Sequence, residues 1–350
     1  MLGRILLAGA LILAGCATPP GSAPELHYLG QTQLRAGMTL DHTLIGGLSG
    51  ISYDPAGRQY YIVSDDRSAK APARFYTARI PVSGNGIGDV EFVETRPWLD
   101  RDGRPFGPLD AAAHPPVIPP DAEGIAFDPQ RQRLYWSSEG ERREDGVRLD
   151  PWVRIGGLDG GYLGEFVLPD PLLMTGPDHG ARQNKALEGL SLSPDGRHLW
   201  AAMEGPVSQD GPLPDEHHGA LTRITRFDVE TGAADAEYTY PLDPVSAGPG
   251  GDNGLSDLVA LDDGTFLIIE RGYGTHVSAR IYRARITEGS TELTKTLAVD
   301  LTATPGLSPL DNIEGITLGP KLPDGRQSVI LVSDDNFSPT QVTQFLLFAM

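Results

Sequence analysis

Hydrophobic and polar residues alternate with a period of two through most of the chain, and the alternation recurs in five similar paired runs. Each pair begins with an apolar residue followed by Ser or Glu, passes through a turn containing Asp with Gly or Pro, and ends on a carboxylate. Such alternation on either side of a tight turn is typical of an antiparallel β-hairpin. The first runs begin at Leu48, Ala122, Leu187, Leu255 and Ile313.

The spacing of these hairpins predicts the fold. A repeat of roughly 60 to 75 residues suits a propeller blade of four antiparallel strands with some long loops. We therefore predict an all-β fold, a β-propeller of four-stranded blades, with five blades counted and a sixth hidden in the insertions as the alternative. The last blade lacks one strand, while residues 25–34 form an unassigned run. We expect this N-terminal run to complete the last blade and close the ring, because closure removes exposed strand edges.

The first residues have a different character. Arg4 precedes an apolar run over residues 5–13, and Leu13-Ala14-Gly15-Cys16 follows. This is the pattern of a secretory signal peptide, here residues 1–15, and its end resembles the bacterial lipobox, in which the Cys is acylated. We expect Cys16 to be a lipid anchor, residues 16–24 a tether, and residues 25–350 one propeller domain. The alternative is an ordinary signal peptide in which the Cys occurs by chance.

Composition and charge narrow the possible partners. Cys16 is the single cysteine, so no intramolecular disulfide is possible, and 43 Gly with 30 Pro suit a chain with many turns. The net charge of −19 argues against nucleic-acid binding, which needs a basic surface. Ala17 follows Cys16, and by resemblance to sorted lipoproteins this favours the outer membrane. We expect a monomer in the periplasm or cell envelope, held to the membrane by its lipid.

The repeated acids are the candidate chemistry. In a propeller the first strand of each blade lines the channel, and the second runs antiparallel to it. The start of the first strand and the end of the second therefore share one face. The predicted inner ring is Ser49, Glu123, Glu188, Ser256 and Glu314, with Asp257 beside it. The predicted second ring is Asp65, Glu139, Glu204, Glu270 and Asp334, which follow the inner ring by 16, 16, 16, 14 and 20 residues.

Crowded carboxylates repel one another in a semi-enclosed site, so something must neutralise them. Ca²⁺ accepts six to eight oxygen ligands, and we expect Ca²⁺ to be bound by Asp257 and the acids of the two rings. Arg67, Lys185 and Arg271 would offset part of the charge or bind an anionic substrate. The alternative is that the acids cap their hairpins by accepting backbone N–H groups.

Several segments resemble a known family. Asp121-Ala122-Glu123-Gly124-Ile125-Ala126, Lys185-Ala186-Leu187-Glu188-Gly189-Leu190 and Asp311-Asn312-Ile313-Glu314-Gly315-Ile316 are similar to the signature of the bacterial phytase-like family described as "esterase-like activity of phytase". Residues 100–106 and the ending Ser333-Asp334-Asp335-Asn336-Phe337 resemble it too.

This resemblance implies a metal-dependent phosphoric-ester hydrolase acting on a small phosphorylated or ester substrate. The sequence departs from the family pattern where Ser49 and Ser256 replace Glu. No serine lies in the Gly-x-Ser-x-Gly turn of a serine esterase, and no catalytic residue is assigned. The alternative is a non-catalytic periplasmic ligand-binding or scaffold propeller, since propellers host many functions.

Overall fold

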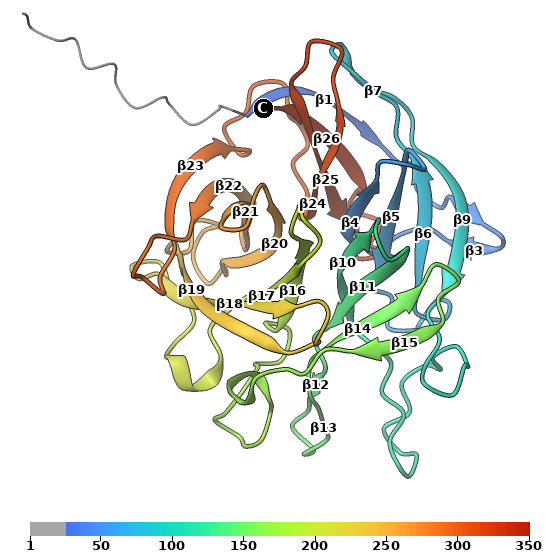
Figure 1. Cartoon of the computed structure of the whole chain (residues 1–350), viewed down its shortest axis with the longest axis vertical. Coiled ribbons are helices and arrows are strands. Elements are labelled where there is room, and N and C mark those ends of the chain that lie inside the picture. The colour runs from blue at the N-terminus through green and yellow to red at the C-terminus, as the bar shows by residue number, and fades with distance from the viewer. Residues whose placement is uncertain (1–25) are drawn as a thin grey trace, which may run out of the picture.

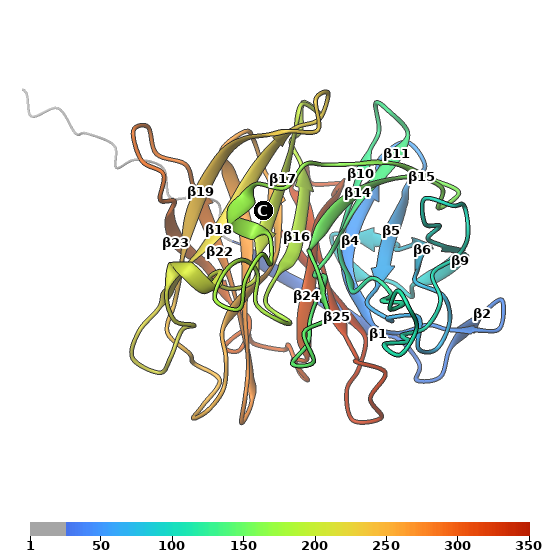
Figure 2. The same cartoon turned by 90° about the horizontal axis from the view of Figure 1, so that it is seen from below.

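The computed structural model describes residues 26–350, and these form five antiparallel sheets arranged around a central channel (Figure 1). Apart from two short 3₁₀ helices, η1 (Asp170–Leu172) and η2 (Ser208–Asp210), the regular structure of this part of the chain is all β. The view from below shows the inner strands running along the channel (Figure 2). The predicted signal segment, Cys16 and the whole of the predicted tether lie outside the described residues.

The sheets follow one another along the chain, and we number them as blades one to five. Blade one holds β4 (Leu48–Asp54), β5 (Gln59–Ser64), β6 (Arg74–Arg79) and β9 (Glu91–Pro97). Blade two holds β10 (Ala122–Asp128), β11 (Arg133–Ser138), β14 (Trp152–Gly157) and β15 (Tyr162–Glu165). Blade three holds β16 (Leu187–Leu192), β17 (His198–Met203), β18 (Ala220–Asp228) and β19 (Ala234–Leu242).

The last two blades complete the ring. Blade four holds β20 (Gly254–Ala260), β21 (Thr265–Tyr273), β22 (Val277–Arg285) and β23 (Thr294–Asp300). Blade five holds β24 (Asn312–Lys321), β25 (Gln327–Asp334), β26 (Gln344–Ala349) and β1 (His27–Gln33). Short two-stranded ribbons decorate the loops: β2 (Thr39–Leu40) with β3 (Thr43–Leu44), β7 (Val82–Ser83) with β8 (Gly86–Ile87), and β12 (Glu141–Arg142) with β13 (Arg148–Leu149).

The ring closes through its N-terminal strand, as the sequence predicts. β1 pairs antiparallel with β26, from His27 opposite Ala349 to Gln33 opposite Gln344. In Figure 1 the blue β1 lies beside the red β26, so the first and last strands of the described residues meet in one blade. The rings of Tyr28 and Phe348 pack 5.4 Å apart across this pair. Five blades are therefore confirmed, and the six-blade alternative is wrong.

The core lies between neighbouring blades, where the inward faces of their strands meet. Trp136 of β11 is buried, and its ring stacks on that of Trp98 at 4.3 Å with an interplanar angle of 3°. Trp98 belongs to the Pro- and Gly-rich insertion that follows β9. This insertion is thus partly built into the core between blades one and two.

The glycine that follows the repeated Ser or Glu allows the inner strands to approach one another. A Cβ on Gly50 would lie 2.4 Å from the carbonyl oxygen of Glu123, and one on Gly124 would lie 2.4 Å from that of Glu188. Any side chain here would force neighbouring blades apart. A register irregularity falls at the same place in blade one, between Leu48 and Ile51. These close contacts narrow the channel into a waist.

Among residues 26–350, no helix has the length and apolar character needed to cross a bilayer.

Candidate functional site

Carboxylates from four blades converge at one mouth of the channel, on the side of the waist where the inner strands begin. We call this group the acid cluster; its members are Asp65, Asp121, Glu123, Glu139, Glu188, Glu204, Glu314 and Asp334. Oxygen atoms of Asp121, Glu123 and Glu139 lie within 4.8 Å of one another, and so do those of Glu139, Glu188 and Glu204. The predicted convergence is observed for seven of these eight acids, all except Asp121, which was not predicted.

Burial and mutual repulsion disturb the protonation of the acid cluster. Burial raises the pKa of five members of the cluster well above its ordinary value, and neighbouring carboxylates add to the effect. These five are Asp65, Glu123, Glu139, Glu188 and Asp334. Burial raises the pKa of Asp121 to about 6 although Arg67 opposes it. Burial also raises the pKa of Glu314, which Arg271 opposes. The cluster therefore holds its full negative charge only at a cost in free energy.

Two kinds of carboxylate occur in the cluster. Glu139 accepts the backbone N–H of Ala186 at 2.5 Å, and Asp334 accepts that of Asn336 at 2.7 Å, as the hairpin-capping alternative expects. The Glu188 side chain is different, because no donor in residues 26–350 lies within hydrogen-bonding distance of it. Glu188 is only 7% exposed. Its carboxylate oxygens still reach the solvent of the channel, and no backbone N–H group of the described residues bonds to them, so capping does not explain this acid.

The three predicted cations lie at this mouth, and each joins two carboxylates. Arg67 pairs with Asp121 at 3.6 Å and with Glu141. The Nζ of Lys185 lies 2.9 Å from Glu204 and 2.8 Å from Asp252, and Arg271 lies 3.0 Å from Glu314 and 3.6 Å from Glu204. Burial alone would lower the pKa of Lys185, but Glu204 and Asp252 outweigh it and the pKa is raised.

Blade four places a base where the other blades place an acid. In blade three Leu187 pairs with Met203, and the next residue is Glu204. In blade four Leu255 pairs with Glu270, and the next residue is Arg271. The blade-four hairpin is one residue shorter, and a shift of one residue turns a side chain to the opposite face of a strand. Arg271 therefore occupies the second-ring position in blade four.

Glu270 lies outside the acid cluster, so its predicted place in the second ring is corrected. Its carboxylate accepts the hydroxyl of Tyr240 at 2.7 Å and the side-chain amide of Asn253 at 2.9 Å, and it pairs with Lys295. These partners belong to the packing between blades three and four. The recurrent acid in the sequence marks the end of the strand, while the register decides which way it points.

Asp257 is also placed apart from the cluster. Its two oxygens accept backbone N–H groups of Leu258 and Ile316, both at 2.8 Å. Burial raises its pKa, and hydrogen bonds from Ile316, Leu258 and Leu190 lower it. Asp257 stands where other blades have Gly, and it links three blades through their backbones. The neighbouring Ser256 donates to the carbonyl of Ile313 at 3.1 Å.

Ser49, the other departure from Glu, keeps a polar role in the cluster. Its hydroxyl donates to the carboxylate of Glu123 and lies 3.4 Å from Glu314. A donor between two acids relieves some of their repulsion. Blade one still supplies a carboxylate, because Asp65 keeps the second-ring position.

Sequence reasoning missed Asp121 and Asn312 as members of the site. Asn312 donates its side-chain amide to Glu314 at 2.7 Å. Both residues lie two positions before the repeated Glu, and residues two apart on a strand share a face. That spacing was the available signal, because both residues stand inside the family-like segments.

The donor set fits a hard cation. Carboxylate oxygens are the ligands that Ca²⁺ and Mg²⁺ prefer, and no histidine or cysteine accompanies the two close groups of acids. The positive charges of Lys185, Arg271 and Arg67 leave several carboxylates unpaired, Glu188 among them. A site able to hold a cation is thus present in the described residues.

Comparison with known proteins identifies the family of this chain. The sequence matches the family described as "Phytase-like: Esterase-like activity of phytase" over residues 43–337. A search of curated proteins found no match.

Solved structures that superpose on this fold have low sequence identity to the chain. Hydrazine synthase of Kuenenia stuttgartiensis is 11% identical with a TM-score of 0.40, covering 85% of this chain and 81% of that one. Periplasmic gluconolactonase of Pseudomonas aeruginosa is 13% identical with a TM-score of 0.38, covering 88% and 90%. Xylan β-1,4-xylosidase of Bacillus halodurans is 10% identical with a TM-score of 0.47, covering 87% of this chain and 53% of the xylosidase.

Proposed function

Because the chain belongs to the phytase-like family over most of its length, we propose that it is a metal-dependent hydrolase of phosphoric esters, with the acid cluster as its site. The observation that carries the proposal is Glu188. Its buried carboxylate faces Glu139 and Glu204 and has no hydrogen-bond donor in residues 26–350. A cation is the partner that such a carboxylate lacks.

The two close groups of acids supply the ligands in this proposal. Asp121, Glu123 and Glu139 form one group, Glu139, Glu188 and Glu204 form the other, and Glu139 is common to both. Ca²⁺ is the favoured ion because it tolerates irregular cages of many oxygens. When bound, such an ion supplies positive charge for phosphoryl oxygens and Lewis acidity at the reacting group.

The bases of the mouth would orient the substrate. Lys185 and Arg271 lie side by side against Glu204, at one edge of the cluster. Their N–H groups suit the oxygens of a phosphate ester, which would replace carboxylate partners as it binds. Arg67 lies at another edge, beside Asp121, and is half-buried. The substrate is accordingly a small anionic ester that enters from the open mouth.

A non-catalytic binding or scaffold propeller is the second candidate, and one observation favours it. Each of Arg67, Lys185 and Arg271 is already held by two carboxylates. A base fixed in this way is less available to a substrate. In that case the mouth would bind a cation alone and stiffen the ring.

Turnover and cation binding together decide between these two functions. Chelator-treated protein would be assayed with p-nitrophenyl phosphate, bis(p-nitrophenyl) phosphate and p-nitrophenyl acetate, with and without Ca²⁺. We expect phosphate-ester turnover that depends on the cation and falls at least about tenfold in Glu188→Gln. Glu270→Gln is the matched control, because Glu270 lies outside the cluster, and it should keep its activity.

The other outcomes are distinct. Calorimetric Ca²⁺ binding without turnover of any ester would favour the non-catalytic candidate. Neither binding nor turnover would overturn both.

We also propose that the protein is anchored in the cell envelope by acylation of Cys16, with the propeller carried on the short tether as a monomer facing the periplasm. The support is the Leu-Ala-Gly-Cys sequence and the single cysteine. Cys16→Ser should move the protein from the membrane fraction, where the outer membrane is expected, to the soluble fraction. A wild-type protein without acyl mass, and a variant that stays with the membrane, would contradict this.

A further inference from the structure

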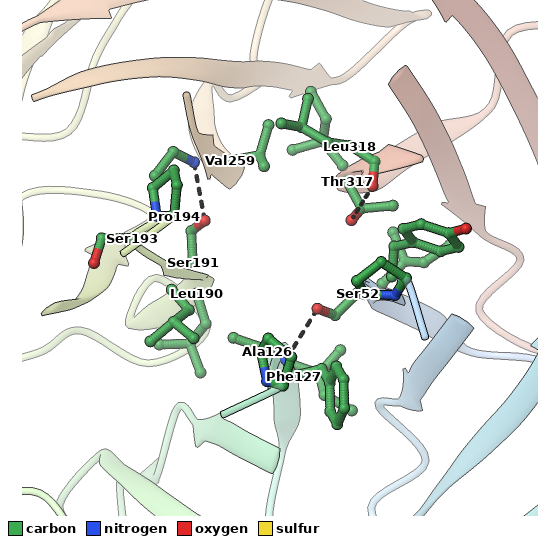
Figure 3. A pocket seen from close by; sticks show the side chains of 18 of the residues that line it. Ser52, Ala126, Phe127, Leu190, Ser191, Ser193, Pro194, Val259, Thr317 and Leu318 are labelled. Carbon is green, nitrogen blue, oxygen red and sulfur yellow. Dashed lines mark hydrogen bonds between the residues drawn. The ribbon is translucent and has the colours of Figure 1, made fainter. Parts of the chain in front are cut away.

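The mouth of the channel opposite the acid cluster contains a cavity of about 330 Å³, lined by side chains from all five blades (Figure 3). In the inner strand β4, Ser49 contacts the acid cluster, the strand ends at Asp54, and Pro55 follows at this second mouth. At about 3.3 Å per residue the two mouths are roughly 20 Å apart. The glycine contacts of the waist lie between them, so this cavity is a separate site.

The repeat itself makes the cavity. The residue three places after the repeated Ser or Glu is small in each blade: Ser52, Ala126, Ser191, Val259 and Thr317. All five line the cavity, and Figure 3 shows the side chains of these residues around an open centre. Bulkier walls come from Phe127, Leu190 and Leu318. Small residues at equivalent positions of five inner strands leave a hollow that no neighbouring side chain fills.

Two hydroxyls of the cavity, those of Ser52 and Ser191, keep a proton that they can donate. The Oγ of Ser52 accepts the backbone N–H of Phe127 at 3.0 Å, and the Oγ of Ser191 accepts that of Ala260 at 2.9 Å. Neither hydroxyl proton is donated to an acceptor among residues 26–350. Ser191 is only 6% exposed, so little solvent reaches it, and it lines the cavity, where a ligand could accept its hydroxyl proton.

The walls are free of charge. No Asp, Glu, Lys, Arg or His lines the cavity, on a protein whose net charge is −19. Bringing an ion here would strip its hydration without offering a counter-charge. Apolar walls with a few placed donors are the usual composition of a small-molecule site, and the volume is at the lower end of the usual range.

We propose that this cavity binds a small, uncharged, largely apolar molecule that carries a carbonyl or ether oxygen. Its apolar body packs against Phe127, Leu190 and Leu318, and its oxygen accepts the hydroxyl proton of either Ser52 or Ser191, which lie on different sides of the cavity. This binding does not depend on the acid cluster or on hydrolysis.

The test uses a neutral fluorophore with a carbonyl acceptor, 6-propionyl-2-(dimethylamino)naphthalene. Its emission should rise and shift to shorter wavelength on binding, and saturate at one molecule per chain. Thr317→Phe, which fills the cavity from blade five, should weaken binding at least about tenfold. Val259→Phe fills it from blade four and serves if the first variant does not fold.

Two further variants separate this site from other surfaces. Removing the donors in the Ser52→Ala, Ser191→Ala double variant should shift the bound emission to still shorter wavelength, because the carbonyl loses its hydrogen bond. Glu188→Gln, at the other mouth, should leave the titration unchanged. Binding that does not saturate, that survives the filling variants, or whose emission ignores the loss of both hydroxyls would overturn the proposal.

Discussion

Blades three and four present opposite charges at the same place in the channel mouth. In blade three, Glu204 follows the residue that pairs with Leu187, whereas in blade four Arg271 follows the residue that pairs with Leu255. Leu187 and its partner Met203 are 16 positions apart in the sequence, whereas Leu255 and its partner Glu270 are 15 positions apart. A single residue of hairpin length thus replaces a carboxylate with a guanidinium and sends the acid, Glu270, to the other face of the strand.

Because of this difference, negative and positive side chains are unevenly distributed around the mouth of the channel. Blades one, two, three and five carry the carboxylates of the acid cluster, while blade four adds Arg271 between Glu204 and Glu314. Blade four also replaces Glu with Ser256 and Gly with Asp257, and both side chains hold backbone atoms. The repeat therefore keeps its architecture in all blades, and blade four differs in the charge it contributes.

The largest expected effect comes from giving blade four the negative charge that the other blades carry at this position. Arg271→Glu would place a further carboxylate beside Glu204 and Glu314 and remove their shared partner. Loss of one member of a buried ion pair costs about 3–5 kcal/mol, and added repulsion increases this. Urea unfolding in the presence of a chelator should show the loss.

Added Ca²⁺ should restore more stability to Arg271→Glu than to the wild type, because the extra acid favours a cation. Arg271→Gln, without the new charge, should lie between the two proteins and is the control if the first variant fails to fold. An Arg271→Glu protein as stable as the wild type in chelator would show that the charge of blade four does not matter.

The pH dependence of stability tests the acid blades together. The folded pKa of Asp121 is raised to about 6, and burial raises the pKa of Glu123 and Glu188 further above their ordinary values. The folded state therefore binds more protons than the unfolded state between the ordinary and the raised pKa values. The free energy of unfolding must then fall as the pH rises through this window.

Between pH 5 and pH 7 Asp121 alone contributes about 1 kcal/mol to this fall, and the other members of the cluster add to it. The measurement is urea unfolding in chelator across this range. Saturating Ca²⁺ should reduce the fall, because the cation offsets the charge that protons otherwise cancel. Stability that rises with pH in chelator would contradict the electrostatic account of the cluster.

The sequence predicts the architecture well because its signals are local. Alternation with a period of two and turns at regular intervals identify the hairpins, and the missing strand of the last blade points to the N-terminal run. The acids at the mouth follow from the same geometry. Trp98 was not expected in the core, because its partner Trp136 lies in another blade and the insertion carries no periodic pattern.

The errors at the site arise from register and from contacts between blades. The acid at the end of each second strand looks equivalent in the sequence, but Glu270 and Glu204 differ by one step in pairing. Asp257 resembles a ring carboxylate until its partners are known, and these are backbone groups of Leu190 and Ile316 in other blades. The sequence of one repeat does not show which residues pair across its hairpin. It also does not show which groups of the neighbouring blades its side chains contact.

The smallest expected effect is the change in stability when one Glu in blade three or blade four is replaced by Gln. It distinguishes the two blades because the two replacements should change the free energy of unfolding in different directions. Glu188→Gln removes a buried charge that has no donor, so in chelator the variant should be as stable as the wild type or more stable by roughly 1 kcal/mol. Glu270→Gln weakens bonds to Tyr240 and Asn253 and breaks the pair with Lys295, so it should lose roughly 1–3 kcal/mol. Added Ca²⁺ should raise the melting temperature of Glu270→Gln as much as that of the wild type, and raise that of Glu188→Gln less. If both variants lost stability equally and neither changed the response to Ca²⁺, then Glu188 would be a structural cap like Glu270, and the register of blade four would carry no consequence for the site.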